Sequence, residues 1–169
     1  MTFVNCVRVF LLSAWFGAAL FFSAVVAPNV FSVLHSFPLA NANEIAGTIV
    51  TRTLSVISVG GFVIGLLALA ALIISKQTGS RVLLGVEVVS LALLVVATAV
   101  GHWVIAARML ALRTATMIPI DQVLASDPRR IAFNSLHHHS VVALGIAMLT
   151  ALTALVAIMR AGGRTNYRA

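Results

Sequence analysis

The sequence is poor in charged residues, and this excludes an ordinary water-soluble fold. Only 9% of its 169 residues are Asp, Glu, Lys or Arg, whereas about 25% is usual in a soluble domain. Hydrophobic residues make up 61% of the chain, and its mean hydropathy is +1.10. A soluble domain of this size could not bury so much apolar surface. The chain is therefore expected to lie in a membrane.

Cysteine and acidic residues are also scarce. The single cysteine, Cys6, excludes an internal disulfide and a metal site built from several cysteines. Four acidic residues against eleven basic ones give a net charge of +7. In a chain of this hydropathy, basic residues flank membrane segments, where they set topology and contact anionic lipids. We therefore expect membrane lipids, bound lipid included, among the partners, and no nucleic acid.

Four apolar runs are long enough to cross a bilayer, for which about 20 residues are needed. They cover residues 9–27, 53–75, 82–107 and 140–159. The connections are too short for a separate soluble domain, so residues 1–169 are expected to form one domain. The predicted fold is all-α, a polytopic membrane protein with an antiparallel bundle of four transmembrane helices.

Signals at the helix ends predict that three helices project beyond the bilayer on the non-cytoplasmic side. The first helix is expected to continue past Pro28 and to break before Pro38, because proline disfavours helix at the residue before it. Asn41 or Asn43 is placed to cap the second helix. Asp127-Pro128 has the residue types of a cap and a first helical position, which would start the fourth helix about three turns before its apolar run.

The placement of Lys and Arg favours N- and C-termini in the cytoplasm. Six basic residues lie on the side of the termini and five on the other. Two of the six, Lys76 and Arg81, flank a tight turn at residues 77–80, and the positive-inside rule gives most weight to short connections. The basic tail from Arg160 to Arg168 lies on the same side.

Helical phase gathers the polar side chains of the third run on one stripe. At 100° per residue, Glu87, Ser90, Thr98, His102 and Arg108 fall close to one line. Polar groups that face lipid are costly, so this stripe is expected to face the bundle interior or a partner.

Glu87 has the strongest need for a partner. It lies about two turns inside the membrane, where an unpaired carboxylate costs at least about 2 kcal/mol. It is expected to be protonated, to pair with Arg8 or Arg81, or to relay protons or cations. In the last case Glu87, Thr98 and His102 would form the polar path of a small transporter.

Glycines predict close helix contacts. Gly61 and Gly65 share one face of the second run, and Gly17 lies on a face of the first run with other small residues. Small side chains allow helix backbones to approach closely in lipid. We therefore predict helix packing at Gly17, Gly61 and Gly65.

Histidines gather near the non-cytoplasmic boundary, and imidazole binds zinc, haem iron and chlorophyll magnesium. Consecutive helical residues point about 100° apart, so at most one of His137–His139 can face inward beside His102. The phase selects His137, which shares a stripe with Ser140. Zinc prefers three or four ligands, whereas haem or chlorophyll needs one axial histidine. His102 and His137 are thus candidate cofactor ligands, and a structural role is the alternative for each.

Three segments together resemble the transmembrane protein 205-like family, known in bacteria as the domain of unknown function 4149. They are Trp15-Phe16-Gly17 through Phe21-Phe22 to Ala27-Pro28 and Phe31, then Ala106-Ala107-Arg108 to Leu112-Arg113, and Phe133-x-x-Leu136-His137-x-x-Ser140. The resemblance implies a small four-helix protein of a bacterial inner membrane, and it adds weight to His137 and Ser140. It implies no biochemical activity.

Three functions follow as hypotheses. Because no phosphate loop, nucleophile elbow or Ser/His/Asp arrangement occurs, we do not expect an enzyme. The leading hypothesis is a nonenzymatic accessory or structural subunit that packs against a larger membrane protein complex. The first alternative is a haem- or chlorophyll-binding subunit of an electron-transfer or photosynthetic complex. The second is the small transporter described above.

Overall fold

The computed structural model describes residues 2–74, 80–116 and 118–164, and these form helices joined by turns and loops. Residues 77–79 of the expected turn, Ser75 at the end of the second predicted span, Lys76, and tail residues 165–169 lie outside the described residues. The elements are α1 (Phe3–Phe21), the π-helix η1 (Phe22–Val26), α2 (Ala27–His35), α3 (Ala42–Ile74), α4 (Arg81–Ala99), the π-helix η2 (Val100–Ala106), α5 (Ala107–Thr114) and α6 (Pro128–Arg164).

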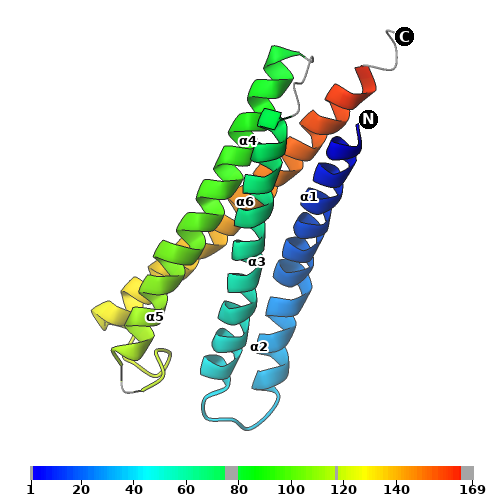
Figure 1. The fold of residues 1–169 in the computed structure, drawn as a ribbon. Helices are drawn as coiled ribbons and strands as arrows, with labels where there is room; N and C mark the ends of the chain where they lie inside the picture. The colour runs from blue at the N-terminus through cyan, green and yellow to red at the C-terminus, as the bar shows by residue number, and fades with distance from the viewer. Residues whose placement is uncertain (1, 75–79, 117, 165–169) are drawn as a thin grey trace.

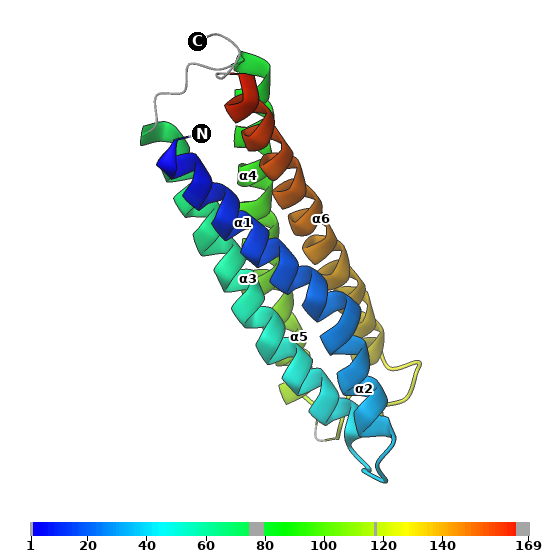
Figure 2. The same ribbon diagram turned by 90° about the vertical axis from the view of Figure 1, so that its right-hand side faces the viewer.

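These elements make four long rods, because η1 and η2 continue without a break into their neighbours. The rods are Phe3–His35, Ala42–Ile74, Arg81–Thr114 and the one formed by α6, and all 4 are long and apolar enough to cross a membrane. They run in alternating directions, as Figures 1 and 2 show. The predicted four-helix membrane bundle is therefore confirmed.

The rods form a closed ring. The first packs against the second and the fourth, and the third also packs against the second and the fourth. The start of α1 and the end of α6 lie at one end of the bundle, together with the end of α3 and the start of α4 (Figure 1). We name this the terminal end. The opposite end, with the connections 36–41 and 115–127, is the loop end.

All four rods extend beyond their apolar runs at the loop end. The first continues to His35, the second begins at Ala42 and the fourth at Pro128, as expected. The third differs from the expectation, because α5 carries it to Thr114 instead of Ala107. Residues 107–113 are good helix formers and contain neither glycine nor proline. Four projecting helices, rather than three, therefore build the loop end.

Close helix contacts centre on the second rod. Its Gly61 lies against the Trp15 ring, where a Cβ atom would come within 2.6 Å of Cε2. A Cβ atom on Gly65 would come within 2.7 Å of Val95 Cγ2. The Trp15 indole also donates a hydrogen bond to the carbonyl of Ile57, at 2.8 Å. The predicted packing at Gly61 and Gly65 is confirmed.

Gly17 does not pack against another helix of this chain among the described residues. Gly17 is exposed, and a Cβ atom added to it would meet nothing within 4 Å. The opposite side of α1 faces the core through Leu12, Trp15 and Ala19, which are all buried. The fit of Trp15 against Gly61 fixes this rotation of the helix, and a pattern of small residues within α1 alone could not reveal it.

The π-helix η1 accommodates a proline in the first rod. Pro28 lacks an N–H group and its ring clashes with the preceding turn of an α-helix. The wider turn of η1 comes directly before it, and the N–H of Ala27 bonds to the carbonyl of Phe22, five residues back. Asn29 donates its side-chain amide to the carbonyl of Val25 at 2.8 Å. The rod thus continues past Pro28 with its backbone groups bonded.

The π-helix η2 rotates the end of the third rod, and this corrects the prediction for Arg108. A π-helical turn holds more residues than an α-helical turn, so side chains beyond it lag in phase. Before η2, Glu87, Ser90 and Thr98 are buried, as the α-helical phase predicts. Beyond it, Arg108 is exposed and Arg113 turns inward instead.

Candidate functional site: an amphipathic cavity at the loop end

Glu87 pairs with Arg8 near the terminal end. The two side chains form an ion pair between α4 and α1, and both are almost completely buried, with 1% and 2% of their surfaces exposed. A second nitrogen of Arg8, Nη1, donates to Asn5 Oδ1 at 3.3 Å. Of the partners considered from the sequence, the structure selects Arg8, and Arg81 is exposed.

A cavity of about 400 Å³ lies among the rods farther toward the loop end. Its wall is mainly apolar, and both π-helices contribute to it, η1 through Phe22 and Ser23, η2 through Gly101 and His102. π-Helical turns are frequent at functional sites. All four rods supply polar side chains to the wall: Ser23, Thr51, Ser55, Ser58, Thr98, His102, His137 and Ser140.

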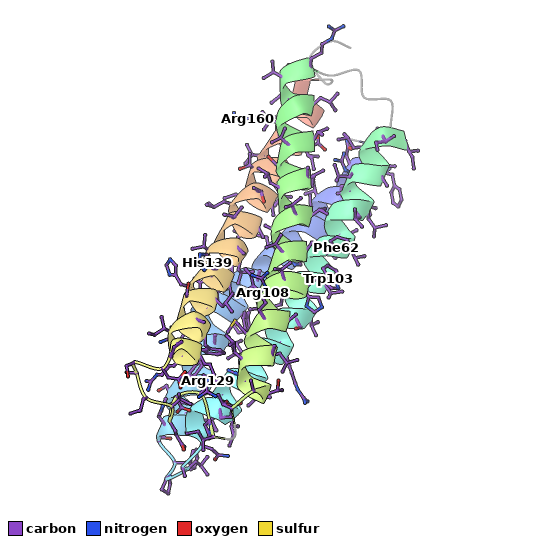
Figure 3. All side chains as sticks on the ribbon, turned by 90° about the vertical axis from the view of Figure 1, so that its left-hand side faces the viewer. Phe62, Trp103, Arg108, Arg129, His139 and Arg160 are labelled. Carbon is purple, nitrogen blue, oxygen red and sulfur yellow. The ribbon has the colours of Figure 1, made fainter. Side chains whose placement is uncertain are left out.

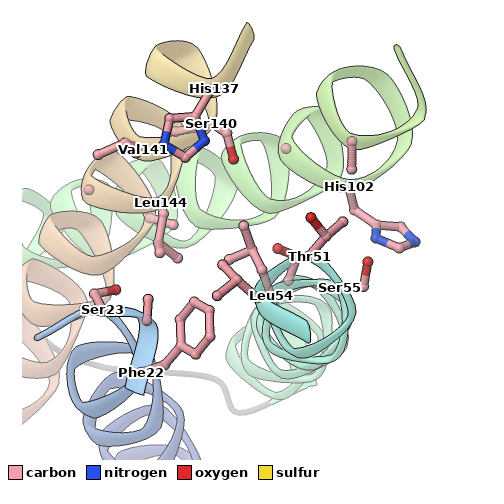
Figure 4. A pocket seen from close by; sticks show the side chains of 18 of the residues that line it. Phe22, Ser23, Thr51, Leu54, Ser55, His102, His137, Ser140, Val141 and Leu144 are labelled. Carbon is pink, nitrogen blue, oxygen red and sulfur yellow. The ribbon is translucent and has the colours of Figure 1, made fainter. Parts of the chain in front are cut away.

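The cavity brings together the predicted residues His102, His137 and Ser140. Figure 4 shows the His137 ring at one side of the cavity and the His102 ring at another, beside Ser55 of α3. His137 retains exposed surface, whereas His102 is half-buried. Thr98 also lines the cavity, but Glu87 does not. The three residues of the predicted transport path are therefore divided between the cavity and the Arg8 pair.

The His102 ring packs against another aromatic side chain, but one of its nitrogen atoms has no hydrogen-bond partner among the described residues. Its ring packs edge-to-face against Trp103, with 4.8 Å between the ring centroids, and Trp103 in turn packs against Phe62 at 4.9 Å. Figure 3 shows Phe62 and Trp103 side by side. The Nδ1 atom of His102 is buried and has no hydrogen-bond partner among the described residues. A buried ring nitrogen of this kind has unused bonding capacity.

A smaller cavity of about 200 Å³ adjoins the first, and its mainly apolar wall also contains charged side chains. Its ionisable side chains include Glu44, Arg113 and Asp121. The two cavities share five lining residues, Phe31, Val50, Thr51, Met109 and His137. The two cavities therefore lie next to each other, and the ionisable side chains belong to the wall of the smaller one, toward the loop end.

Arg113 lies in the wall of the smaller cavity. Its guanidinium lies over the Phe133 ring, 5.1 Å from the centroid, and Nη1 lies 3.8 Å from Glu44 Oε1. It also fills the place of a side chain at Gly47, where a Cβ atom would lie 2.4 Å from Arg113 Nη2. The Nε atom is buried and has no partner in the described part of the chain.

Asp121 brings the 115–127 connection to the same cavity. Its Oδ2 atom accepts a hydrogen bond from Asn43 Nδ2 at 2.8 Å, whereas its buried Oδ1 atom has no partner within the described ranges. Gln122 donates to the carbonyl of Ala40 at 3.0 Å, which further ties this connection to the start of α3. Arg113 and Asp121 therefore both line this cavity.

The sequence contained few signals for these two residues. The phase of an uninterrupted α-helix points Arg108 inward, and Arg113 moves inward because of η2. Asp121 lies in a connection without helical periodicity, so its position depends on tertiary contacts with α3. Arg113 did stand in one of the segments that resemble a known family, at Leu112-Arg113.

The remaining histidines lie outside the cavity. The Nδ1 atoms of His35 and His139 lie 2.8 and 2.7 Å from carbonyls of their own helices, and His139 points away from the bundle (Figure 3). His138 is exposed and packs against His139. Within the described ranges, no three His, Cys, Asp or Glu side chains lie close enough together to hold a metal ion.

Asp127 caps α6 where this helix leaves the connection. Its Oδ1 atom accepts the backbone N–H of Arg129 at 2.8 Å, and Oδ2 accepts from Arg129 Nη2 at 2.8 Å. The side-chain hydrogen bonds from Arg129 contribute most to lowering the pKa of Asp127 below its ordinary value, and the backbone bond adds to this. The predicted start of the fourth helix at Asp127-Pro128 is confirmed.

Comparison with known protein families assigns the chain to one of them. A family model described as "Domain of unknown function (DUF4149)" matches residues 10–117. The chain belongs to this family. In this DUF4149 protein the match includes both π-helices, His102 and Arg113, whereas His137 and Ser140 lie beyond it. No curated protein and no solved structure matches the chain.

Proposed function

We propose that this DUF4149 protein is a nonenzymatic accessory subunit of the membrane that holds one amphipathic, lipid-like molecule among its helices. The observation that carries the proposal is the mainly apolar cavity of about 400 Å³ with a smaller cavity beside it, whose wall contains Glu44, Arg113 and Asp121. Ligand sites in proteins commonly enclose about 300–1,000 Å³ and combine an apolar wall with a few polar groups. The relationship to transmembrane protein 205-like proteins is part of this proposal.

The position of the apolar cavity favours a molecule that comes from the bilayer. Its wall belongs to rods that cross the membrane, and part of this wall is exposed at Val141. A cavity without contents forfeits dispersion contacts along its whole wall. An acyl chain restores those contacts, and the hydroxyl groups of Thr51, Ser55 and Ser140 can bond to polar atoms where the chain joins its headgroup.

The amount of lipid that stays with the purified protein tests whether a lipid occupies the cavity. Gly145 lines the cavity, and a Cβ atom added there meets nothing within 4 Å, so Gly145→Phe can begin its side chain without a clash and should place a ring in this space. We expect this variant to retain several-fold less lipid per chain than the unmodified protein, as measured by mass spectrometry. Gly85→Phe is the matched control, because Gly85 is exposed and also has open space beside it. Equal retention in all three proteins would reject the proposed occupant.

The accessory role rests on the outer surface of the first rod, along α1 and η1. Ser13, Gly17 and Ala24 are exposed there, and small residues allow a helix of a partner to approach closely in lipid. A larger membrane protein complex is the proposed partner. Native gel analysis after gentle solubilisation should reveal a species larger than one chain. A stable monomer without any co-purifying protein would contradict this role.

The proposed location is a bacterial inner membrane with N- and C-termini cytoplasmic. The balance of Lys and Arg between the two sides supports this orientation. Cys6 is exposed near the start of α1 and is the only cysteine, so it provides a unique label. An impermeant thiol reagent should label Cys6 only after the cells are opened. Labelling in intact cells would reverse the orientation.

A tetrapyrrole is a second candidate occupant of the cavity. The observation in its favour is the buried, unpartnered Nδ1 atom of His102 on the same wall as His137. Haem or chlorophyll would add visible absorption bands to the purified protein. We expect His102→Leu or His137→Leu to remove these bands if either residue is the axial ligand. A colourless protein, after expression in cells that make the pigment, would reject this candidate.

A further inference from the structure

Building on the lipid-holding function proposed above, we propose that the smaller cavity selects a phospholipid whose headgroup carries both a phosphate and a primary amine. The two cavities share Phe31, Val50, Thr51, Met109 and His137. Because the cavities are neighbours, the proposed molecule extends from one to the other, with its acyl chain in the larger cavity and its headgroup among Glu44, Arg113 and Asp121.

The charges around the headgroup position disfavour a purely anionic headgroup. Two carboxylates, those of Glu44 and Asp121, accompany the single guanidinium of Arg113 on the wall of the smaller cavity. A headgroup with a phosphate alone would add a negative charge beside both carboxylates. A headgroup with a phosphate and an ammonium group matches the guanidinium with one charge and a carboxylate with the other.

Arg113 provides the contact for the phosphate. Its Nη1 atom is 3.8 Å from Glu44 Oε1, beyond normal hydrogen-bond distance, and its buried Nε atom has no partner among the described residues. Phe133 on one side and Gly47 on the other hold the guanidinium in place. An arginine in this position can donate two parallel hydrogen bonds to phosphate oxygens.

Asp121 provides the contact for the amine. Asn43 already occupies Oδ2, while the buried Oδ1 atom has no partner in the described part of the chain. A primary ammonium group has N–H donors that can bond to Oδ1, whereas a quaternary ammonium group has none. The structure therefore favours an ethanolamine headgroup over a choline headgroup of the same charge.

Competition among lipids with identical acyl chains tests this inference. The full-length protein is stripped of lipid and transferred into nanodiscs that contain equal amounts of phosphatidylethanolamine, phosphatidylcholine and phosphatidylglycerol. Lipid that stays bound is then measured by native mass spectrometry. We expect phosphatidylethanolamine to be enriched about tenfold over phosphatidylcholine, the effect of one hydrogen bond to a charged group.

Two variants assign the selectivity to the named residues. Asp121→Leu should reduce the preference for ethanolamine over choline to near one, because the retention of phosphatidylethanolamine falls to that of phosphatidylcholine. Arg113→Gln should lower the retention of all three phospholipids about tenfold. Arg108→Gln is the matched control, because Arg108 lies on the same helix end but is exposed, and it should behave like the unmodified protein.

The outcomes separate the two proposals. If the unmodified protein retains lipid that Gly145→Phe displaces, but without preference among headgroups, the lipid-holding function stands and the headgroup inference is overturned. If the protein retains no phospholipid of any kind, both fail. Should Arg113→Gln fail to fold, Gly47→Ala replaces it, since a Cβ atom there displaces the guanidinium and keeps the charge. The preference of the unmodified protein decides the inference without any variant.

Discussion

The two ends of the bundle use buried polar groups in opposite ways. Near the terminal end, Glu87 and Arg8 neutralise each other inside the fold, although the Nε atom of Arg8 is also buried without a partner among the described residues. Toward the loop end, Arg113 Nε, Asp121 Oδ1 and His102 Nδ1 are buried but have no partner within the described ranges. Buried polar groups in native proteins are usually bonded, so exceptions point to places where another molecule supplies the bond.

We therefore expect the paired charges to stabilise the fold and the unpaired polar groups to bind another molecule. A paired charge in a low-dielectric interior fixes the helices that carry it, because removing one member leaves the other unpaired. An unpaired polar group does not hold two helices together in this way, but it can bind a molecule that enters the cavity. We therefore expect substitutions near the terminal end to affect folding, and those around the cavity to affect the bound molecule.

Breaking the Arg8–Glu87 pair should have the largest effect. Glu87→Leu leaves the Arg8 guanidinium buried without a counter-charge, and the loss of one partner of a buried pair costs about 3–5 kcal/mol. We expect this loss in the free energy of unfolding in detergent. The double variant Arg8→Met with Glu87→Leu should recover most of it, because an apolar pair removes both charges. A single variant as stable as the unmodified protein would mean that Glu87 is protonated and the pair contributes little.

Gly61→Ala should have the next largest effect. The added Cβ atom would lie 2.6 Å from Trp15 Cε2, so the indole must move away from Ile57 as well. Overpacking of this kind costs about 1–3 kcal/mol. Gly60→Ala is the matched control, because its Cβ atom would lie at an ordinary distance of 3.8 Å from the same ring. Equal unfolding temperatures for both variants would contradict the close contact.

Acidification should loosen the start of α6, which is a smaller and local effect. The pKa of Asp127 is lowered in the folded protein by the hydrogen bonds from Arg129. A group with a lowered pKa stabilises the fold above its unfolded pKa, and this contribution disappears as the pH falls through the folded value. Once corrected for intrinsic exchange rates, amides 129–131 should lose hydrogen-exchange protection below the ordinary pKa of 3.8. Asp127→Asn keeps the cap without titration and should show no such change.

His102→Leu should have the smallest effect on folding. The Nδ1 atom makes no hydrogen bond to any described residue, so an apolar side chain of similar size removes no bond from the described fold. We expect the free energy of unfolding to change by less than about 0.5 kcal/mol after lipid has been removed. A large loss would show that His102 is a structural residue, and the contrast between the two ends would then disappear.

Hydropathy predicted the four rods because the cost of exposing polar groups to lipid dominates their composition. The same cost predicted that Glu87 must be protonated or paired, and the structure then selected Arg8 over Arg81. Gly61 and Gly65 could be predicted because close contacts in lipid favour glycine. Each of these features follows from a local rule that holds along a single helix.

The residues that line the cavity could not all be predicted from the sequence of any single helix. Arg113 faces inward instead of Arg108 because η2 shifts the helical phase, and a periodicity of 100° per residue assumes a helix without a π-helical turn. Gly17 faces outward because Trp15 fits Gly61 on another rod. Asp121 reaches the cavity through Asn43, which is 78 residues away in the sequence. Contacts between distant segments therefore decide which polar groups meet there.

The Arg8–Glu87 pair also sets an order for biosynthesis. Its members are 79 residues apart, so the first helix reaches the translocon well before its counter-charge has been made. At about 5–20 residues per second, the ribosome needs roughly 4–16 s to reach Glu87. Until then the long side chain of Arg8 can extend to the headgroups from its place near the start of the helix. We therefore expect the first helix to reach its final depth only after the third helix has been made, and a chain released before that point to leave its first helix closer to the headgroups.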